Sequence, residues 1–273
     1  MHVTRLSLRI VAATSLLLLG ACAAPLRTPP SQSAVGEARI ERIDQVFDLS
    51  RDVTRVAIDN PWGEINVRAR EEREVGIHAV IQRLPPRFAK AVLRSHRDGD
   101  TMRIEVGFDA AEAPAGRADI AVYLPNELAL ALHTQSSRIS AKKRAGAVEA
   151  STDSGEILVS SRERLRLRTR SGQVRAIAIG ARWQGPSEIV SDSGRIILLV
   201  PTFGDIALSA ETGGRLGTNF GLSVHRGDDG HSRAGARYGL GTSTLDVRSD
   251  TGEIVLEQLV LLGDDGAYLG DDD

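Results

Sequence analysis

Residues 148–159 read VEASTDSGEILV, and this stretch contains the pattern on which the fold depends. Apolar residues stand seven and five positions before Gly155 and two and four positions after it, namely Val148, Ala150, Ile157 and Val159. Alternation with a period of two is typical of a β-strand that buries one face. The stretch therefore predicts two short strands joined by a turn at Thr152-Asp153-Ser154-Gly155.

The same register recurs along the chain around other glycines or their substitutes. Its other anchors are Gly63, Ser137, Gly172, Gly194, the pair Gly213-Gly214, and Gly252. From Ser137 onward the anchors are 18, 17, 22, about 20 and finally 38 residues apart, and the last interval equals two periods with one degenerate copy. Repeats of this length predict an all-β repeat architecture. We expect a β-solenoid, similar to a parallel β-helix, and the alternative is a β-sandwich of hairpins.

The anchor glycines are expected to be structural turn residues, and the set comprises Gly63, Gly155, Gly172, Gly194 and Gly252. Asp, Ser and Thr beside them can hydrogen-bond their own backbone, and glycine adopts a positive φ at no steric cost. A phosphate-binding loop would need a strand leading into a helix, and no such junction accompanies these glycines.

Charged residues of alternating sign occupy the outward positions of consecutive repeats. Two positions before the anchor stand Asp153, Arg170 and Asp192, and six positions before it stand Glu149, Arg166 and Glu188. Parallel stacking would place each arginine between two carboxylates on neighbouring strands, which favours the solenoid. The arginine run from Arg164 to Arg170 is then the solvent-facing side of one strand, and we expect no nucleic acid partner.

The first residues have the features of a bacterial secretion signal. Arg5 and Arg9 precede an apolar stretch from Ile10 to Leu19 that is too short to remain as a membrane anchor. The order Leu19-Gly20-Ala21-Cys22 resembles a lipobox, in which the cysteine becomes the lipid-bearing first residue of the mature protein. Cys22 is the only cysteine of the chain, so no disulfide can form within one molecule.

We therefore expect residues 1–21 to be a lipoprotein signal peptide and residues 22–38 a lipidated tether. The tether is rich in proline and serine and lacks apolar periodicity. Ala23 after the cysteine resembles the pattern that Gram-negative bacteria sort to the outer membrane. The expected location is the cell envelope, with a lipid anchor, and the outer membrane in a Gram-negative cell.

Beyond the tether we expect a smaller β-rich module at 39–125, the β-repeats at 126–260 and an acidic tail at 261–273. Strands of the first module are expected near residues 53–58, 64–68, 75–81, 102–108 and 119–124, with a hairpin turn at Asp98-Gly99-Asp100.

Three other segments carry weaker patterns. Residues 87–96, after two prolines, are expected to form a short helix, and the Gly- and Asp-rich residues 219–241 a loop between coils. The tail, with five aspartates after residue 263, is expected to be disordered.

Several outward positions are apolar, although a solvated face would not need them. They are Leu158, Ile177, Ile197, Leu199 and Val255. We expect another layer of the same chain to cover them, and the alternative is a partner.

Two further segments resemble a known family. Ala121-Val122-Tyr123-Leu124-Pro125 before the turn repeats, and Tyr238-Gly239-Leu240-Gly241 leading into residues 245–255, are similar to motifs of the bacterial putative adhesin family of β-strand-repeat proteins, a domain of largely unknown function. The resemblance covers roughly residues 45–258. It implies a β-solenoid in the cell envelope.

Two functions from different classes follow. The first is a non-catalytic, lipid-anchored envelope protein that presents a rigid β-repeat surface for binding or scaffolding, with an envelope protein or polysaccharide as its partner. The alternative is a carbohydrate-active β-helix enzyme acting on envelope or extracellular polysaccharide. The sequence has no nucleophile elbow, and only 4% of its residues are aromatic, whereas sugar-binding clefts usually stack rings on aromatic side chains.

No cofactor is expected, because the six histidines lack the spacing of a metal site. Two places leave metal binding open. One is the loop in which His225 and His231 flank Asp228-Asp229, and the other is the acidic tail.

Overall fold

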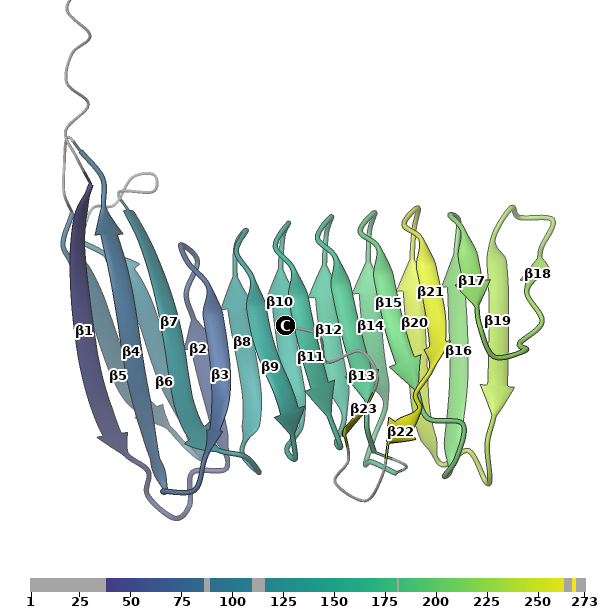
Figure 1. Ribbon diagram of the computed structural model, residues 1–273, viewed down its shortest axis with the longest axis horizontal. Helices are drawn as coiled ribbons and strands as arrows, with labels where there is room; N and C mark the ends of the chain where they lie inside the picture. The colour runs from purple at the N-terminus through teal and green to yellow at the C-terminus, as the bar shows by residue number, and fades with distance from the viewer. Residues whose placement is uncertain (1–37, 86–88, 110–115, 181, 263–266, 269–273) are drawn as a thin grey trace, which may run out of the picture. The chain divides into compact units, whose positions relative to one another are not determined.

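A computed structural model describes residues 38–85, 89–109, 116–180, 182–262 and 267–268, all within one compact unit that spans Gly36–Asp273. The described residues form β-strands and no helix, and two large mixed sheets contain nearly all of these strands (Figure 1). The all-β class predicted from the repeats is therefore confirmed.

Sheet A has 10 strands. Their spatial order is β1 (Arg39–Asp48), β4 (Glu74–Arg83), β7 (Gly116–Pro125), β3 (Ile65–Arg70), β9 (Ile139–Arg144), β11 (Ile157–Ser161), β13 (Val174–Ala178), β15 (Ile196–Val200), β21 (Ile254–Gln258) and β17 (Leu216–Thr218).

Sheet B has 11 strands. Their spatial order is β18 (His225–Arg226), β19 (Ser232–Arg237), β16 (Ile206–Thr212), β20 (Ser243–Ser249), β14 (Ser187–Ser191), β12 (Leu165–Thr169), β10 (Val148–Thr152), β8 (Ala129–Thr134), β2 (Arg55–Asp59), β6 (Thr101–Phe108) and β5 (Ala91–Asp98). A separate antiparallel pair joins β22 (Leu261–Leu262) to β23 (Ala267–Tyr268).

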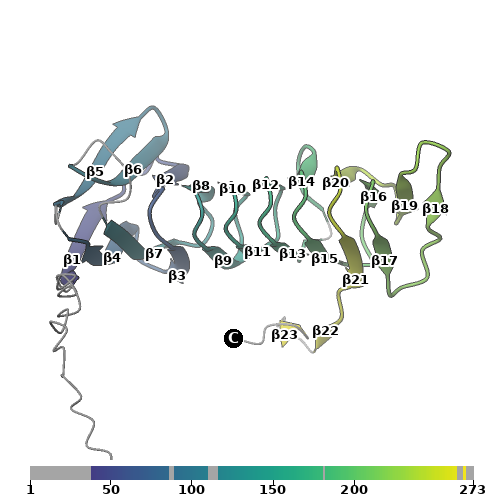
Figure 2. The same cartoon turned by 90° about the horizontal axis from the view of Figure 1, so that it is seen from above.

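Each repeat contributes one strand to each sheet, and from β8 to β15 consecutive repeats pair in parallel. Val148 lies opposite Leu165 in sheet B, and Ile157 lies opposite Val174 in sheet A, so a repeat is displaced by one strand at constant register. Figure 2 shows the two sheets facing each other with one coil after another along the stack. The predicted parallel pairing of neighbouring repeats is confirmed.

Part of the charge pairing predicted from the alternation is present between neighbouring strands. Arg166 lies opposite both Glu149 and Glu188 on the neighbouring strands. The guanidinium of Arg170 lies 3.4 Å from the carboxylate of Asp153.

Stacking order departs from chain order near both ends of the sheets. At one end, β6 and β7 pair on the outer side of β2 and β3, although they follow them in the chain and β8 comes later. At the other end, the coil of β20 and β21 is inserted between two earlier coils. Its neighbours are β14 and β15 on one side and β16 and β17 on the other. The interval of 38 residues before Gly252 therefore contains no degenerate repeat. It contains instead β18 and β19, which pair antiparallel beside β16.

One apolar core lies between the sheets and follows the alternation read from the sequence. The inward side chains are almost fully buried in every coil, for example Val148, Ile157, Val174 and Leu198. This burial supplies the main driving force for stacking, at about 25 cal/mol per Å² of apolar surface removed from water.

The anchor glycines are required for a reason other than the expected one. None of the predicted turn glycines has a positive φ. A Cβ on Gly172 would instead overlap the backbone carbonyl of Gly155, and one on Gly194 would overlap that of Gly172. The turns are stacked so closely that only a residue without a side chain fits between successive coils.

A buried hydroxyl three positions before the anchor completes the turns at Gly155, Gly172, Gly194 and Gly252. The backbone N–H of Gly155 donates to Thr152 Oγ1 at 3.0 Å, and that of Gly172 donates to Thr169 Oγ1 at 2.9 Å. Gly194 and Gly252 use Ser191 and Ser249 in the same way. The hydroxyl satisfies an amide that is shielded from water.

Three local predictions meet different outcomes. The hairpin is confirmed, because Asp98 pairs with Thr101 across Gly99 and Asp100. The short helix at 87–96 is wrong, because β5 begins at Ala91 and alternating side chains pack it on β6. The loop at 219–241 is wrong in part, because β18 and β19 lie within it.

Candidate functional site

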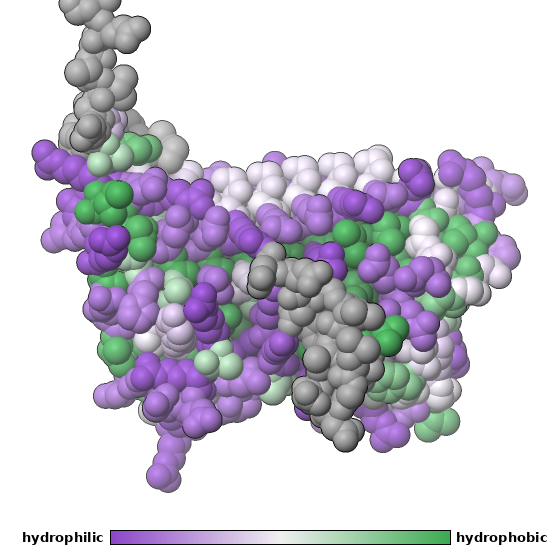
Figure 3. Space-filling model, viewed as in Figure 1, coloured by the Kyte–Doolittle hydropathy of each residue, from purple (hydrophilic) through white to green (hydrophobic). Residues whose placement is uncertain are grey.

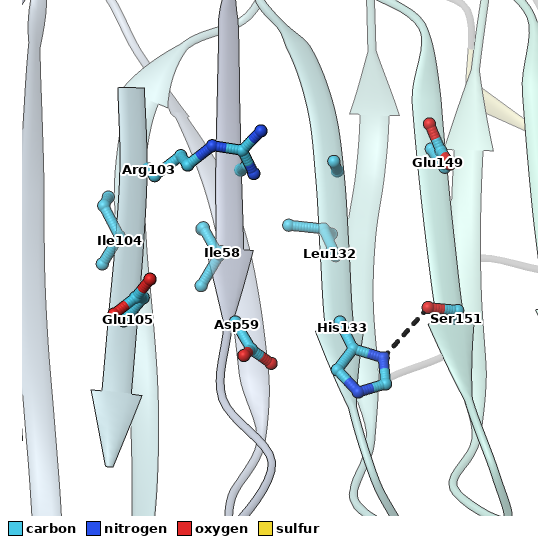
Figure 4. A pocket seen from close by; sticks show the side chains of 11 residues that line it. Ile58, Asp59, Arg103, Ile104, Glu105, Leu132, His133, Glu149 and Ser151 are labelled. Carbon is cyan, nitrogen blue, oxygen red and sulfur yellow. Dashed lines mark hydrogen bonds between the residues drawn. The ribbon is translucent and has the colours of Figure 1, made fainter. Parts of the chain in front are cut away.

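A shallow hollow lies on the outer face of sheet B, over β6, β2, β8 and β10. The outward residues at its centre are small, because Ala57 of β2 pairs directly with Ala131 of β8. Longer side chains flank them, since Arg103 of β6 lies opposite Ala57 and Glu149 of β10 lies opposite Ala131. Two alanines thus form the floor, and the cavity volume is about 250 Å³. Figure 4 shows Arg103 and Glu149 on the flanking strands.

A row of polar residues crosses the same four strands two residues further along each strand. Asp59 lies opposite Glu105 on one side and opposite His133 on the other, and His133 lies opposite Ser151. His133 Nδ1 and Ser151 Oγ are 3.0 Å apart and share a hydrogen bond (Figure 4).

Partial burial and the like charge of Glu105 perturb the pKa of Asp59 in this row. Partial burial raises the pKa of its carboxyl above the ordinary value, and the carboxylate of Glu105 raises it further, whereas His133 lowers it. The hollow therefore holds a carboxyl that is protonated more readily than a fully solvated one.

An ion pair closes the opposite side of the hollow. Arg55 Nη2 lies 2.6 Å from Glu149 Oε2, and both side chains are about half exposed. Exposed pairs of this kind contribute about 0–1 kcal/mol, so Arg55 and Glu149 can exchange their mutual contact for a polar ligand at small cost.

The row contains a serine, a histidine and an aspartate, yet its geometry differs from that of an acyl-transfer site. Ser151 occupies the Nδ1 side of His133, and the described contacts include no hydrogen bond between His133 and Asp59. The strands use their backbone N–H groups in the sheet ladder, so they offer none of the convergent donors that stabilise an oxyanion. The arrangement can recognise hydroxyl or charged groups of a ligand.

Sequence reasoning did not find this row, although the repeat contains the signal. Asp59, His133 and Ser151 each stand four positions before an anchor, namely Gly63, Ser137 and Gly155. Equal offsets place side chains at equal register once the coils stack in parallel. Glu105 lacks such an anchor, because β6 belongs to a coil that the pattern did not identify.

The site residues predicted from the sequence, Cys22 and the five turn glycines, do not belong to the hollow. Cys22 lies outside the described residues. The five turn glycines lie in the turns and do not line the hollow, although Gly63 and Gly155 follow Asp59 and Ser151 by only four positions.

Among the described residues, no group of three or more His, Cys, Asp or Glu could hold a metal ion. Of the two places that left metal binding open, the aspartates of the acidic tail lie outside the described residues. In the loop, His231 Nδ1 is 3.2 Å from Glu211, and Arg233 makes ion pairs with Asp229 and Glu211. The Arg233 guanidinium keeps the pKa of Asp229 well below its usual range. Arg233 thus occupies two of the carboxylates near the histidines, those of Asp229 and Glu211.

No described part of the chain forms a helix of the length and apolarity that a membrane span requires.

Comparison with known proteins gives a likeness in fold. No protein-family model matches the chain, and no curated protein matches it significantly. The crystal structure of a putative cell adhesion protein from Clostridium sporogenes ATCC 15579 matches with a TM-score of 0.50 and 14% sequence identity, covering 80% of this chain and 100% of that one. At this identity the likeness concerns the fold alone.

Two further solved structures match at lower similarity. A putative adhesin from Bacteroides fragilis NCTC 9343 has a TM-score of 0.25 and 10% identity, and one from Parabacteroides distasonis ATCC 8503 has a TM-score of 0.22 and 7% identity. Each match covers 80% of this chain and 97% of the other.

Proposed function

We propose that this protein is a non-catalytic, lipid-anchored protein of the cell envelope whose β-solenoid presents a rigid surface for binding, in the manner of an adhesin. The observation that carries the proposal is the parallel, constant-register pairing of consecutive repeats in both sheets. Such pairing fixes outward side chains in rows about 4.7–4.9 Å apart, a spacing suited to an extended ligand.

The clostridial structure supports the proposal, because its whole length is matched and it is named a putative cell adhesion protein. We propose that this chain shares the surface location that such a name indicates. Residues 1–21 would direct export and 22–38 would tether the folded unit to a membrane through lipid on Cys22, with the outer membrane as the site in a Gram-negative cell.

The hollow on sheet B is the proposed point of recognition. Its alanine floor fits the apolar face of a small ring, and the carboxylates and arginines around it fit hydroxyl groups. A saccharide unit of an envelope or extracellular polysaccharide combines both features, so we propose a polysaccharide as the partner.

Two measurements test the anchor and the binding separately. Full-length protein labelled with palmitate in a Gram-negative host should carry label and sediment with membranes, and Cys22→Ala should do neither. The unlipidated variant should then bind members of a polysaccharide array. Ala131→Trp fills the hollow and should weaken that binding at least tenfold, whereas Ser140→Trp on sheet A should not. Equal binding by both variants would contradict recognition in the hollow.

A second function is supported by one observation. Asp59 and Glu105 are directly paired carboxylates in an open hollow, and paired carboxylates can act as acid and nucleophile in glycoside hydrolysis. Release of reducing ends from an array polysaccharide would support the enzyme if Asp59→Asn abolished it. Binding without release supports the non-catalytic proposal.

A further inference from the structure

The first strand of sheet A is open along one side. β1 is 10 residues long and pairs with β4 over its whole length without a bulge, and no described strand pairs with its other side. Figures 1 and 2 both place β1 at the end of the stack. An open edge exposes a row of backbone N–H and C=O groups that can pair with another strand. β1 is therefore a long template for such pairing.

The opposite end of the stack has no edge of this length. There the described parts of the two sheets end in β17 and β18, which have only 3 and 2 residues. Very short edge strands are one means by which proteins prevent pairing between edges, and proline, lysine or a bulge in the edge strand are others. β1 contains no proline or lysine, and its register with β4 is regular. It thus lacks several of the devices that block pairing.

The side chains of β1 alternate between the two faces of sheet A. Ile43 packs partly against the core, so the residues at even positions face outward. The outward row consists of Ile40, Arg42, Asp44 and Val46. Its order along the strand is apolar, positive, negative and apolar.

The two apolar residues of this row are exposed to solvent, Ile40 by 63% and Val46 by 59%. On β4 they lie opposite Gln82 and Gly76, so neither has an apolar side chain directly across from it. Figure 3 shows hydrophobic side chains among hydrophilic ones at the end of this face where Figure 1 places β1 and β4.

Further along the same face, the chain covers its own apolar residues. Ile177 and Leu199, two of the outward apolar positions singled out in the sequence, are buried in a cluster with Leu259, which follows β21. The segment after β21 thus contributes to the covering that we expected from the same chain. Ile40 and Val46 have no comparable cover among the described residues.

The outward row of β1 is complementary to itself when a second copy pairs antiparallel with the same edge. If Ile43 lies opposite Ile43 of the second copy, residues 39–47 of one chain lie opposite residues 47–39 of the other. Ile40 then meets Val46, and Arg42 meets Asp44, and the symmetry makes each pair twice. Directly opposite residues on one face have their Cβ atoms about 4.5–5.5 Å apart, and pairs of both kinds stabilise a sheet.

Other registers lose this match. A shift by one residue would set the outward row of one copy against core-facing residues of the other, which directly opposite positions do not allow. A shift by two residues sets Arg42 opposite Arg42 or Asp44 opposite Asp44, and like charges directly opposite are destabilising. The register centred on Ile43 alone pairs apolar with apolar and positive with negative.

We propose that two copies of this protein form a symmetric dimer by antiparallel pairing of β1 with β1 of the second copy, centred on Ile43. The interface is isologous, because both copies contribute the same residues. Its two-fold axis is perpendicular to sheet A, so the hollows on sheet B of the two copies open on the same side. The dimer is independent of the ligand of the hollow, so either proposal can fail without the other.

Single cysteines in the full-length chain test the register. Cys22→Ala removes the only native cysteine, and Ile43→Cys then places a thiol next to its counterpart on the axis. Mild oxidation should join two chains by a disulfide, measured on non-reducing gels. Gln45→Cys is the matched control, because Gln45 is half-buried on the same face, but the two copies of this position are about 13 Å apart along the strands. We expect at least tenfold less product from it.

Reversal of charge tests the pairing without a cross-link. In the full-length Cys22→Ala chain, Arg42→Asp sets carboxylates opposite each other and should raise the dimer dissociation constant at least tenfold, measured by analytical ultracentrifugation. Addition of Asp44→Arg exchanges the two charges and should restore most of the affinity. Arg168→Asp, the same change at an exposed position in the middle of the stack, should leave the dissociation constant unchanged.

Three outcomes would overturn the proposal. They are a monomer at every concentration, equal disulfide yields from the two cysteine positions, and a dimer that Arg42→Asp does not weaken. Circular dichroism of each variant separates loss of the dimer from loss of the fold. A variant that keeps its β-signal but dissociates, and that associates again when the second charge is reversed, supports the paired edges.

Discussion

The middle of the stack and its two ends follow different rules. From β8 to β15 each coil pairs with the coil that follows it in the sequence, and the glycine anchors recur at nearly constant spacing. Near the ends, the coils of β6 and β7 and of β20 and β21 take places that chain order does not predict, and antiparallel strands adjoin β7 and β16. A local repeat thus determines the shape of a coil, whereas contacts between distant residues determine its place in the stack.

The largest effect is expected where a distant contact fixes the coil of β20 and β21, which stands out of chain order. Trp183 is 8% exposed, its backbone N–H donates to Ser243 Oγ at 2.9 Å, and its indole N–H donates to Thr244 O at 3.3 Å. These bonds join the loop before β14 to β20. Trp183→Ala should lower the free energy of unfolding by about 4 kcal/mol and speed amide exchange in β20 more than in β10.

Trp62→Ala is the control for this change, because Trp62 is only half-buried and should cost less. Chemical denaturation and hydrogen exchange provide the measurements. Uniform acceleration of exchange over all coils would show that Trp183 does not hold the coil of β20 and β21 specifically.

A somewhat smaller loss of stability is expected in the middle of the stack when a side chain is added between two stacked turns. Gly172→Ala places a Cβ against the carbonyl of Gly155 and should destabilise the protein by about 3 kcal/mol. Gly107→Ala in β6 is the control, since nothing lies within 4 Å of its added Cβ. A cost for Gly172→Ala no greater than that of Gly107→Ala, measured by urea denaturation, would refute the account of the turns.

Removal of one buried hydroxyl should cost less than this overlap. Thr169→Val keeps the shape of the side chain but leaves the N–H of Gly172 without its acceptor, at a cost of about 2 kcal/mol. Thr244→Val, at an exposed outward position of β20, should change stability by less than about 0.5 kcal/mol. Equal midpoints for the two variants in thermal unfolding would exclude the proposed role of the hydroxyl.

The smallest effect concerns pH and the hollow beside the end coil of β6. Because the folded-state pKa of Asp59 is raised above 3.8, the folded protein binds more protons than the unfolded chain between those two values. The contribution of Asp59 to stability is therefore greatest below pH 3.8 and falls as pH rises through the folded pKa. Asp59→Asn should be slightly more stable than the parent at pH 7, and this advantage should disappear near pH 3.5. An advantage that does not change with pH, in urea titrations at both values, would contradict the shift.

Much of this difference between middle and ends could be anticipated from the sequence, and part could not. Apolar alternation around Gly155 predicts paired strands, because a segment that buries every second side chain is a β-strand with one face in the core. The parallel register follows from the charges at Glu149, Arg166 and Glu188. The place of β20 could not be predicted, because Leu245 and Val247 would fit equally well at either end of the stack.

The hollow was harder to predict than the coils. Its floor depends on Ala57 and Ala131, which become neighbours only because β2 pairs with β8 across more than 70 intervening residues. The positive φ expected at Gly155 was wrong, because a single turn read alone does not show the carbonyl that the neighbouring turn brings against it.

The late insertion of β20 and β21 also has a consequence for biogenesis. β16 and β17 emerge first but find their parallel neighbours only in β20 and β21, which are made some 40 residues later. A chain made from its N-terminus onward therefore cannot complete its outermost winding until β20 and β21 have been made. Until then the apolar residues Ile206, Leu208 and Leu216 lack the coil that buries them, so a chain released before β21 is complete should expose an apolar end.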